Sequence, residues 1–299
     1  MSEGYAREIF SVETEDHWQL CVERYRVDAP KGIIVLAHAM FCNARTMDYR
    51  GNGVASACAN YGFEVWNLDF RGHGASGPHA ATGATWTYDD IVQFDVPAVA
   101  AAARKAVSNG PLIWIGHSLG AHAVIAAMSV APELPIDRIV SLAGGVWISQ
   151  LEPSVKRWLQ KVAIFESWLM VTALAGYCPT KRVGFGSEDE AEPYVRQLVL
   201  NGRRNAWLSV GGDIDYLHQM GRVRAPVLSI VGEADGLMCH PVAAREWLLH
   251  LRNAQVYHRV VGSRARDPRG IDHMGLVTCS EMSEVWSELL DWSLTGRKI

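Results

Sequence analysis

The sequence predicts an α/β protein in which a mostly parallel sheet lies between layers of helices. Short, almost continuous apolar runs recur along the chain, which is typical of strands covered on both faces. Helical stretches separate most of these runs, and such alternation builds right-handed parallel crossovers. One long segment in the second half departs from this rhythm and is expected to form a helical insertion.

The strands are expected in the following order. An antiparallel hairpin comes first, between Glu8 and Asp28, where apolar and polar residues alternate around a polar TEDH break. The apolar runs that predict the other strands are Gly32–Ala39, Phe63–Phe70, Pro111–Ser118, Arg138–Gly145, Ala225–Asp235 and Ala254–Val261. Together these segments predict an eight-stranded sheet.

Helices are expected over Asp89–Val107, over Leu119–Ala131 and near Leu276–Leu294. Pro97 lies inside the first of these and is expected to bend it, because proline lacks the N–H that a helix interior needs. These helices cover the sheet and complete the core.

The insertion spans residues 147–220 and separates a core made of residues 1–146 and 221–299. It shows no strand pattern, many helix formers and a concentration of aromatic side chains. At this point of the chain it would lie over the carboxyl ends of the strands, where ligands bind in open α/β sheets. We therefore expect a helical cap, or lid, whose aromatics pack on the core and together wall an apolar pocket.

Composition excludes several classes of function. With 299 residues and a net charge of −4, the chain offers no basic surface for nucleic acid or an anionic membrane. No run approaches the roughly 18 apolar residues of a membrane span, and the N-terminus lacks the order of a signal peptide. Six scattered cysteines suggest reduced thiols, so a soluble, cytoplasmic protein is expected. A homo-oligomer is compatible with the sequence, and no spacing of histidines and acids indicates a metal or another cofactor.

The pentapeptide GHSLG, at Gly116–Gly120, is the most informative motif. An apolar strand leads into it and an apolar helix follows it, as a nucleophile elbow requires. The tight turn would strain the serine backbone and crowd the positions two residues away, where glycines stand. The Ser118 hydroxyl would then project above the sheet at the start of a helix, where the dipole favours negative charge.

Five motifs together resemble the α/β hydrolases of the lipase, esterase and serine-aminopeptidase group, which includes the monoglyceride-lipase-like enzymes. They are LAHAM, NLDFRGHGAS, GHSLG, VGEADGLM and DHMG, which occur in the family's order from about residue 30 to the end. The resemblance implies an α/β-hydrolase fold and no cofactor. It also implies that Ser118 is the nucleophile of a Ser-Asp-His triad.

A serine hydroxyl needs a base, and the base needs a carboxylate that holds its tautomer. Asp235 follows an apolar strand and is the expected acid, with Asp213, Asp215, Glu233 and Asp272 as alternatives. His273 lies in a loop before the last helix and matches the family's base. His240 is the main alternative to it, because His250 is expected in a helix and His258 in a strand.

The resemblance also indicates an oxyanion hole, made by the backbone N–H groups of Met40 and Leu119. Each well-aimed donor would contribute roughly 3 kcal/mol to transition-state stabilisation. Ala39 departs from the glycine usual in this family, which makes Met40 the weaker of the two assignments. The residues placed at the substrate pocket are His38, Phe41, His117, Trp147 and Met238, although His38 is expected mainly to brace its loop.

The function predicted on this basis is hydrolysis of a carboxylic ester of a small to medium, moderately apolar substrate through an acyl-enzyme on Ser118. The same triad could serve an acyltransferase, a lactonase, an amidase or a carbon–carbon hydrolase, because these differ in pocket shape rather than in the triad. A non-catalytic ligand-binding protein on the same fold is the alternative from another class.

Overall fold

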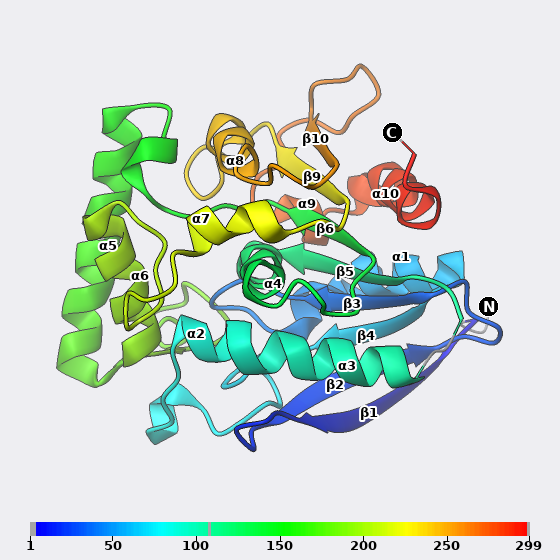
Figure 1. Cartoon of the computed structure of the whole chain (residues 1–299), viewed down its shortest axis with the longest axis horizontal. Helices are drawn as coiled ribbons and strands as arrows, with labels where there is room; N and C mark the ends of the chain where they lie inside the picture. Colours follow the sequence, from blue (N-terminus) through cyan, green and yellow to red (C-terminus); the bar gives the residue numbers. More distant parts are fainter. Residues whose placement is uncertain (1–3, 107–108, 298–299) are drawn as a thin grey trace.

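The computed structural model describes residues 4–106 and 109–297. The remaining residues, which include the chain ends of the expected core and Val107 at the end of an expected helix, lie outside the described residues. Figure 1 shows a central twisted sheet with helices on both faces and a helical segment, α5 and α6, at one end.

Eight strands form the sheet, in the order β1-β2-β4-β3-β5-β6-β9-β10. Only β2 runs against its neighbours, so the sheet is mostly parallel, as the sequence predicts. The strand bounds are β1 (Ala6–Glu13), β2 (Gln19–Arg26), β3 (Ile33–Ala37), β4 (Glu64–Leu68), β5 (Leu112–His117), β6 (Arg138–Leu142), β9 (Val227–Gly232) and β10 (Val256–Val261).

The apolar strands are buried on both faces because their successive side chains enter two different cores. In β3, Ile33 and Val35 belong to a core shared with α3 (Val96–Ala106), α4 (Leu119–Val130) and α8 (Pro241–Leu248). Ile34 and Leu36 belong to the opposite core, under α1 (Val54–Tyr61), α9 (Gly275–Thr278) and α10 (Ser283–Thr295). This two-sided burial explains why the strand sequences lack polar alternation.

Two helices differ from the sequence expectation. The helix around Pro97 begins as α2 (Tyr88–Asp90) and passes through a π-helical segment before α3, since proline cannot donate the hydrogen bond of a regular turn. The last expected helix is divided into α9 and α10, because Cys279 between them has extended backbone angles.

The segment between β6 and β9 contains α5 (Val155–Ala175), α6 (Glu192–Arg204) and α7 (Tyr216–Gln219). It also contains a small antiparallel pair, β7 (Tyr177–Cys178) and β8 (Glu190–Ala191), which the sequence did not predict. Two-residue strands are too short to show an alternating pattern.

Asp89 of α2 fixes this segment to the core. Its carboxylate accepts hydrogen bonds from the Gln197 side chain at 2.7 Å, the Tyr216 hydroxyl at 2.8 Å and the Val210 N–H at 2.7 Å. The half-buried carboxylate of Asp89 thus accepts hydrogen bonds from three positions within residues 197–216. None of the helices among the described residues is long and apolar enough to cross a membrane.

Candidate active site

Ser118 lies in the turn between β5 and α4, at the carboxyl end of the central strand. Its backbone has φ 49° and ψ −107°, which a residue with a side chain rarely adopts. A Cβ on Gly116 would stand 2.2 Å from the Gly120 backbone, and one on Gly120 would stand 2.3 Å from the Ala37 oxygen. Glycine is therefore required at both positions, because a side chain there would collide with the neighbouring backbone. The turn presents the Ser118 side chain to a cavity.

Asp235 and His273 meet above this turn. Asp235 Oδ2 lies 2.6 Å from His273 Nδ1, and Asp235 Oδ1 accepts the N–H groups of Met238 at 3.0 Å and Cys239 at 2.9 Å. Burial alone would raise the pKa of Asp235, but the hydrogen bond and charge of His273 and the two N–H donors lower it below its ordinary value. The carboxylate is thus ionised and holds one ring nitrogen of His273.

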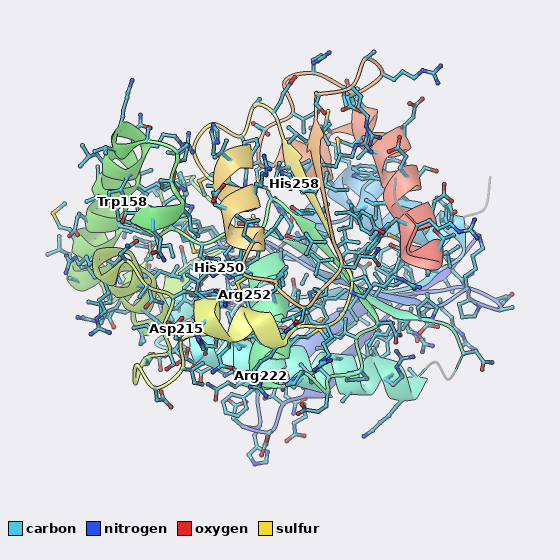
Figure 2. The ribbon with its side chains drawn as sticks, turned by 45° about the horizontal axis from the view of Figure 1, so that its top comes forward. Trp158, Asp215, Arg222, His250, Arg252 and His258 are labelled. Carbon is cyan, nitrogen blue, oxygen red and sulfur yellow. The ribbon has the colours of Figure 1, made fainter. Side chains whose placement is uncertain are left out.

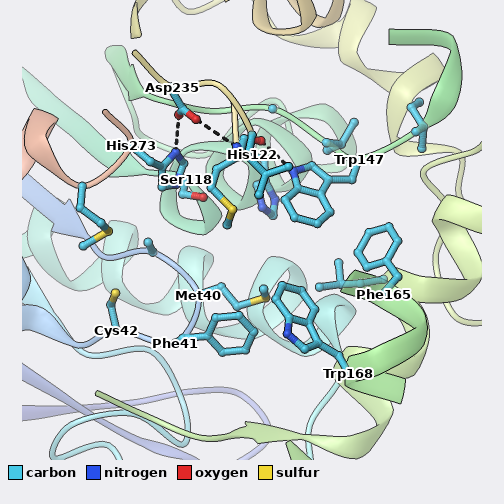
Figure 3. Close-up of a pocket in the computed structure, with 18 of the residues that line it drawn as sticks. Met40, Phe41, Cys42, Ser118, His122, Trp147, Phe165, Trp168, Asp235 and His273 are labelled. Atoms are coloured by element: carbon cyan, nitrogen blue, oxygen red, sulfur yellow. Dashed lines mark hydrogen bonds and ion pairs between the residues drawn. The ribbon is translucent and has the colours of Figure 1, made fainter. Parts of the chain in front are cut away.

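Figure 3 shows Asp235, His273 and Ser118 in succession along one wall of the cavity. The ring of His273 stands beside the ring of His117, with centroids 4.8 Å apart. His117 is fully buried, and its Nε2 lies 3.0 Å from the His273 carbonyl oxygen. Burial lowers the pKa of His117 to about 3, so the neutral ring can donate its Nε2–H to that carbonyl. His117 supports the His273 backbone.

The alternative acids have other partners. Glu233 pairs with Arg269 at 3.4 Å, and Asp215 accepts from the His218 N–H at the start of α7. Asp272 accepts from the Gly275 N–H at 2.8 Å. The carboxylate within hydrogen-bond distance of His273 is that of Asp235.

The alternative histidines lie elsewhere. His240 accepts from the Val242 N–H at the start of α8. His250 stands just beyond α8 rather than inside it, and His258 on β10 lies 3.1 Å from the Ser229 hydroxyl. Both residues are labelled in Figure 2. Neither lines the cavity.

The loop after β3 carries Met40 next to the cavity. Among the described residues, no protein acceptor is recorded for the N–H groups of Met40 and Leu119. Ala39 does not have a positive φ, so an alanine occupies the place of the family's usual glycine without backbone strain. Phe41 follows with φ 63° and donates its N–H to Glu190 at 3.0 Å.

His38 lies beneath this loop and outside the cavity. It is fully buried, its Nδ1 lies 2.8 Å from the Ala39 carbonyl oxygen, and its Nε2 accepts the Phe70 N–H at 3.1 Å. His38 and His117, which the sequence places at the substrate pocket, do not line the cavity, because both rings are buried in the core. Phe41, Trp147 and Met238 do line the cavity.

The cavity has a volume of about 500 Å³ and lies between the sheet's carboxyl end and the segment 147–207. Among the aromatic residues that line it are Phe41, from the loop after β3, and Trp147, Phe165, Trp168, Tyr194 and Trp207 of that segment. Trp147 stacks on Trp168 with centroids 6.0 Å apart and donates its indole N–H to the Met238 oxygen at 2.7 Å. A site of this kind accepts a mainly apolar group.

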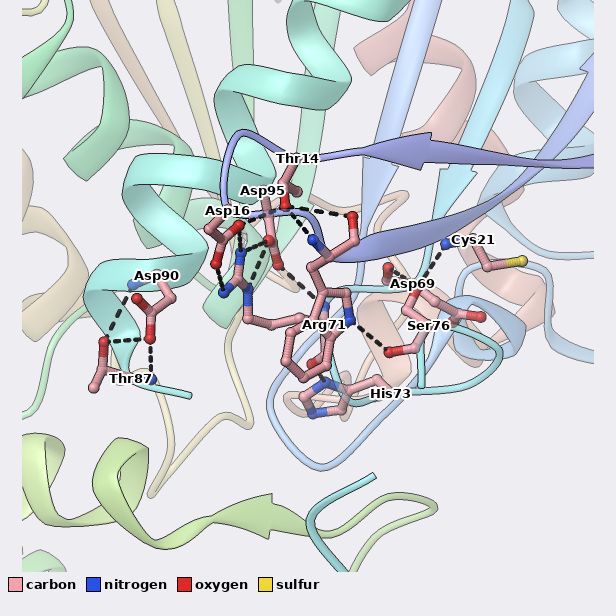
Figure 4. Close-up of polar contacts among 11 residues, drawn as sticks. Thr14, Asp16, Cys21, Asp69, Arg71, His73, Ser76, Thr87, Asp90 and Asp95 are labelled. Carbon is pink, nitrogen blue, oxygen red and sulfur yellow. Dashed lines mark hydrogen bonds and ion pairs between the residues drawn. The ribbon is translucent and has the colours of Figure 1, made fainter. Parts of the chain in front are cut away.

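The loop after β4, which carries Arg71, His73 and Ser76, is a structural support. Arg71 is buried between Asp16 of the hairpin turn and Asp95 before α3, as Figure 4 shows. The Ser76 hydroxyl donates to the Asp69 oxygen and accepts from the Cys21 N–H, each at 2.6 Å. His73 and Ser76 therefore belong to this supporting loop and do not line the cavity.

Two further residues escaped the sequence analysis. Glu190, fully buried, pairs with His73 at 3.0 Å and holds the Phe41 N–H; its position in the acidic run SEDEAEP resembles a solvated surface. His122 lines the cavity, and the one available signal was its place four residues after Ser118, on the same helix face. The described residues contain no cluster of side chains able to hold a metal ion.

The chain matches the model of a known protein family. The model of the family described as serine aminopeptidase, S33, matches residues 28–260. Human lipase member N is 30% identical over 166 residues, which cover 50% of this chain and 42% of that protein. Human lysosomal acid lipase/cholesteryl ester hydrolase is 25% identical over 146 residues, or 44% of this chain and 37% of that protein. The chain thus spans about two fifths of the length of these curated relatives.

Solved structures share the fold at low sequence identity. A Pyrococcus furiosus esterase superimposes with a TM-score of 0.62 at 15% identity, covering 96% of this chain and 90% of that one. A Paleococcus ferrophilus monoacylglycerol lipase gives a TM-score of 0.60 at 17% identity, covering 92% and 99%.

Proposed function

Because the chain belongs to the serine aminopeptidase S33 family of hydrolases, we propose that it is a serine hydrolase that cleaves carboxylic esters. The observation that carries the proposal is the Asp235–His273 hydrogen bond of 2.6 Å beside a strained Ser118 at the head of α4. The relatives named as lipases and esterases support an ester as the substrate.

In the proposed reaction His273 Nε2 takes the proton of the Ser118 hydroxyl while Oγ attacks the ester carbonyl carbon. Asp235 keeps the Nδ1–H in place and stabilises the imidazolium that forms. The negative oxygen of the tetrahedral intermediate accepts hydrogen bonds from the Met40 and Leu119 N–H groups. His273 then gives its proton to the leaving alcohol, and the acyl-enzyme remains on Ser118.

Water completes the cycle by the same path in reverse. His273 removes a proton from the water, which attacks the acyl carbonyl carbon. His273 then gives that proton to the Ser118 oxygen, and the serine leaves as the free alcohol. The apolar lining, including Phe165, Trp168 and Trp207, favours a small to medium apolar group on the substrate. We assign residues 147–220 as the cap that covers this group.

We also propose a cytoplasmic location, which the six free cysteines support. The thiols of Cys42 and Cys239 beside the site are unreactive, since burial raises the pKa of Cys42 to about 12 and that of Cys239 still further.

Intact-mass analysis after treatment with a fluorophosphonate tests the proposal. We expect one adduct on the wild type, none on Ser118→Ala, and one on Ser167→Ala, a control that removes an exposed serine of α5. Turnover of p-nitrophenyl esters should fall by about 10⁴-fold or more in Ser118→Ala.

A folded wild type without adduct would contradict the proposal and favour a ligand-binding protein. Labelling without ester turnover would point to another use of the triad. Product analysis with alcohol acceptors and with lactone, amide and diketone substrates then separates an acyltransferase, a lactonase, an amidase and a carbon–carbon hydrolase.

A further inference from the structure

His122 is a polar side chain in the mostly apolar wall of the cavity. It lies on α4 one helical turn after Ser118, and Figure 3 shows it on the wall with Ser118, opposite Met40, Phe41 and Trp168. The side chain is half-buried and faces the space that a substrate would occupy.

Tyr88 fixes the orientation and the tautomer of this ring. His122 Nδ1 lies 3.0 Å from the Tyr88 hydroxyl oxygen, and the same hydroxyl lies 3.1 Å from the His122 carbonyl oxygen. A carbonyl oxygen only accepts, so the single Tyr88 proton goes to it. Both contacts are then satisfied when Nδ1 carries the ring proton and donates it to the tyrosine oxygen.

The ring is therefore neutral and keeps a lone pair on Nε2. Burial lowers the pKa of His122 to about 3, so the imidazole stays uncharged near neutral pH. Burial also raises the pKa of Tyr88, which keeps its proton available. Among the described residues, no donor pairs with Nε2.

We infer that His122 Nε2 is a substrate-specificity site that accepts a hydrogen bond from a hydroxyl or N–H group on the substrate's apolar part. The inference rests on the proposed function and narrows its substrate class. An acceptor left unpaired in an apolar wall is desolvated at a cost when a plain alkyl chain fills the cavity, and a hydroxylated chain removes that cost.

Tyr88 is the positioning residue for this acceptor. It is buried at the start of α2, where the Gln197 side chain accepts its N–H at 2.9 Å. Without the tyrosine oxygen, the ring proton can move to Nε2, which would then donate into the cavity. The Tyr88→Phe variant should prefer substrates that carry an acceptor instead.

The experiment compares kcat/KM for p-nitrophenyl hexanoate with its hydroxy- and methoxy-substituted analogues at each chain position. A second series varies the alcohol half, using hexanoate esters of diols against simple alkyl esters, to tell which half of the substrate carries the donor. We expect one hydroxylated position to exceed the plain chain by about tenfold in the wild type. The methoxy analogue should show no such gain.

In His122→Leu the hydroxyl preference should disappear, and in Tyr88→Phe the methoxy analogue should overtake the hydroxy analogue. Equal preference in the wild type and His122→Leu would overturn the inference. Absence of both labelling and turnover in the wild type would instead mean failure of the proposed function.

The rate at which Ser118 is labelled gives a measurement that does not depend on turnover, so it also serves for variants with low activity. The rate of Ser118 labelling by an alkyl fluorophosphonate is compared with that of its hydroxylated analogue in the wild type, His122→Leu and His122→Gln. A ratio near one in all three proteins contradicts the inference. A ratio of about ten in the wild type that falls to near one in His122→Leu supports it.

Discussion

At the scale of single residues, the backbone of Ser118 is held in a strained conformation by its neighbours. Its N–H donates to the Leu142 oxygen at 2.8 Å, and the Gly120 N–H donates to the His38 oxygen at 3.1 Å. Such strain costs on the order of 1–3 kcal/mol, which the packing around the turn must offset. The glycines flanking the serine are what allow β3, β5 and α4 to approach closely enough.

The Gly116→Ala variant tests this contact. The new methyl group would stand 2.2 Å from the Gly120 backbone, so we expect a loss of about 3 kcal/mol in the free energy of unfolding, measured by urea denaturation. Gly221→Ala is the control, because a Cβ there meets nothing within 4 Å. A change below about 0.5 kcal/mol in Gly116→Ala would contradict the crowded turn.

At the scale of elements, the loop after β3 is held by the strand β8 and the residues before it. Phe41 donates its N–H to Glu190, and its carbonyl oxygen accepts the N–H groups of Ser187 at 2.8 Å and Glu188 at 3.1 Å. Gly186 lies so close that a Cβ would stand 2.5 Å from the Phe41 Cβ. The segment between β6 and β9 thereby fixes the residue that follows the proposed oxyanion donor, Met40.

The His73–Glu190 pair in this contact predicts a pH dependence of stability. Burial alone would lower the pKa of His73, but the Glu190 charge and hydrogen bond, helped by Glu188, raise it from 6.5 to about 9. The folded state therefore gains stability that is complete below pH 6.5 and is lost as pH rises through 9. The difference corresponds to about 3 kcal/mol.

Urea denaturation at pH 6.5 and pH 9.5 checks this prediction, with Glu190→Gln as the comparison. Asp69 also faces His73 and favours its charge, while His38, 5.0 Å away, stays neutral because burial lowers its pKa. The wild type should lose about 3 kcal/mol more than Glu190→Gln between the two pH values. Equal losses in both proteins would show that the pair is not charged.

At the scale of the whole molecule, the cavity belongs to two parts of the chain. Ser118, Asp235 and His273 come from the sheet and its loops, whereas Phe165, Trp168 and Trp207 come from the segment between β6 and β9. Lys161 of α5, which forms a buried ion pair with Glu152, also contacts the loop after β9, because its Nζ lies 3.4 Å from the Met238 oxygen. In the proposed function, the sheet and its loops therefore supply the catalytic groups, and the segment between β6 and β9 supplies the fit to the substrate.

Replacing one aromatic residue of the segment between β6 and β9 by alanine should change the preference for acyl-chain length and leave the three triad residues in place. In Trp168→Ala we expect the kcat/KM ratio of dodecanoate to butyrate p-nitrophenyl esters to rise by about tenfold, because the cavity lengthens toward α5. Trp158→Ala removes a tryptophan of the same helix that does not line the cavity and should leave the ratio unchanged. A ratio unaffected in Trp168→Ala would contradict a substrate position between the core and α5.

The sequence by itself determined the sheet, its order of strands and helices, and the motifs around Ser118, Asp235 and His273. These depend on local patterns: two-sided burial makes strands continuously apolar, and the elbow needs glycines at fixed spacing. Only the tertiary structure decided that Glu190 holds Phe41, that His38 and His117 face the core, and that His122 faces the cavity. The partners in these contacts lie up to 156 residues apart, and no local pattern records which way a side chain turns once distant segments pack.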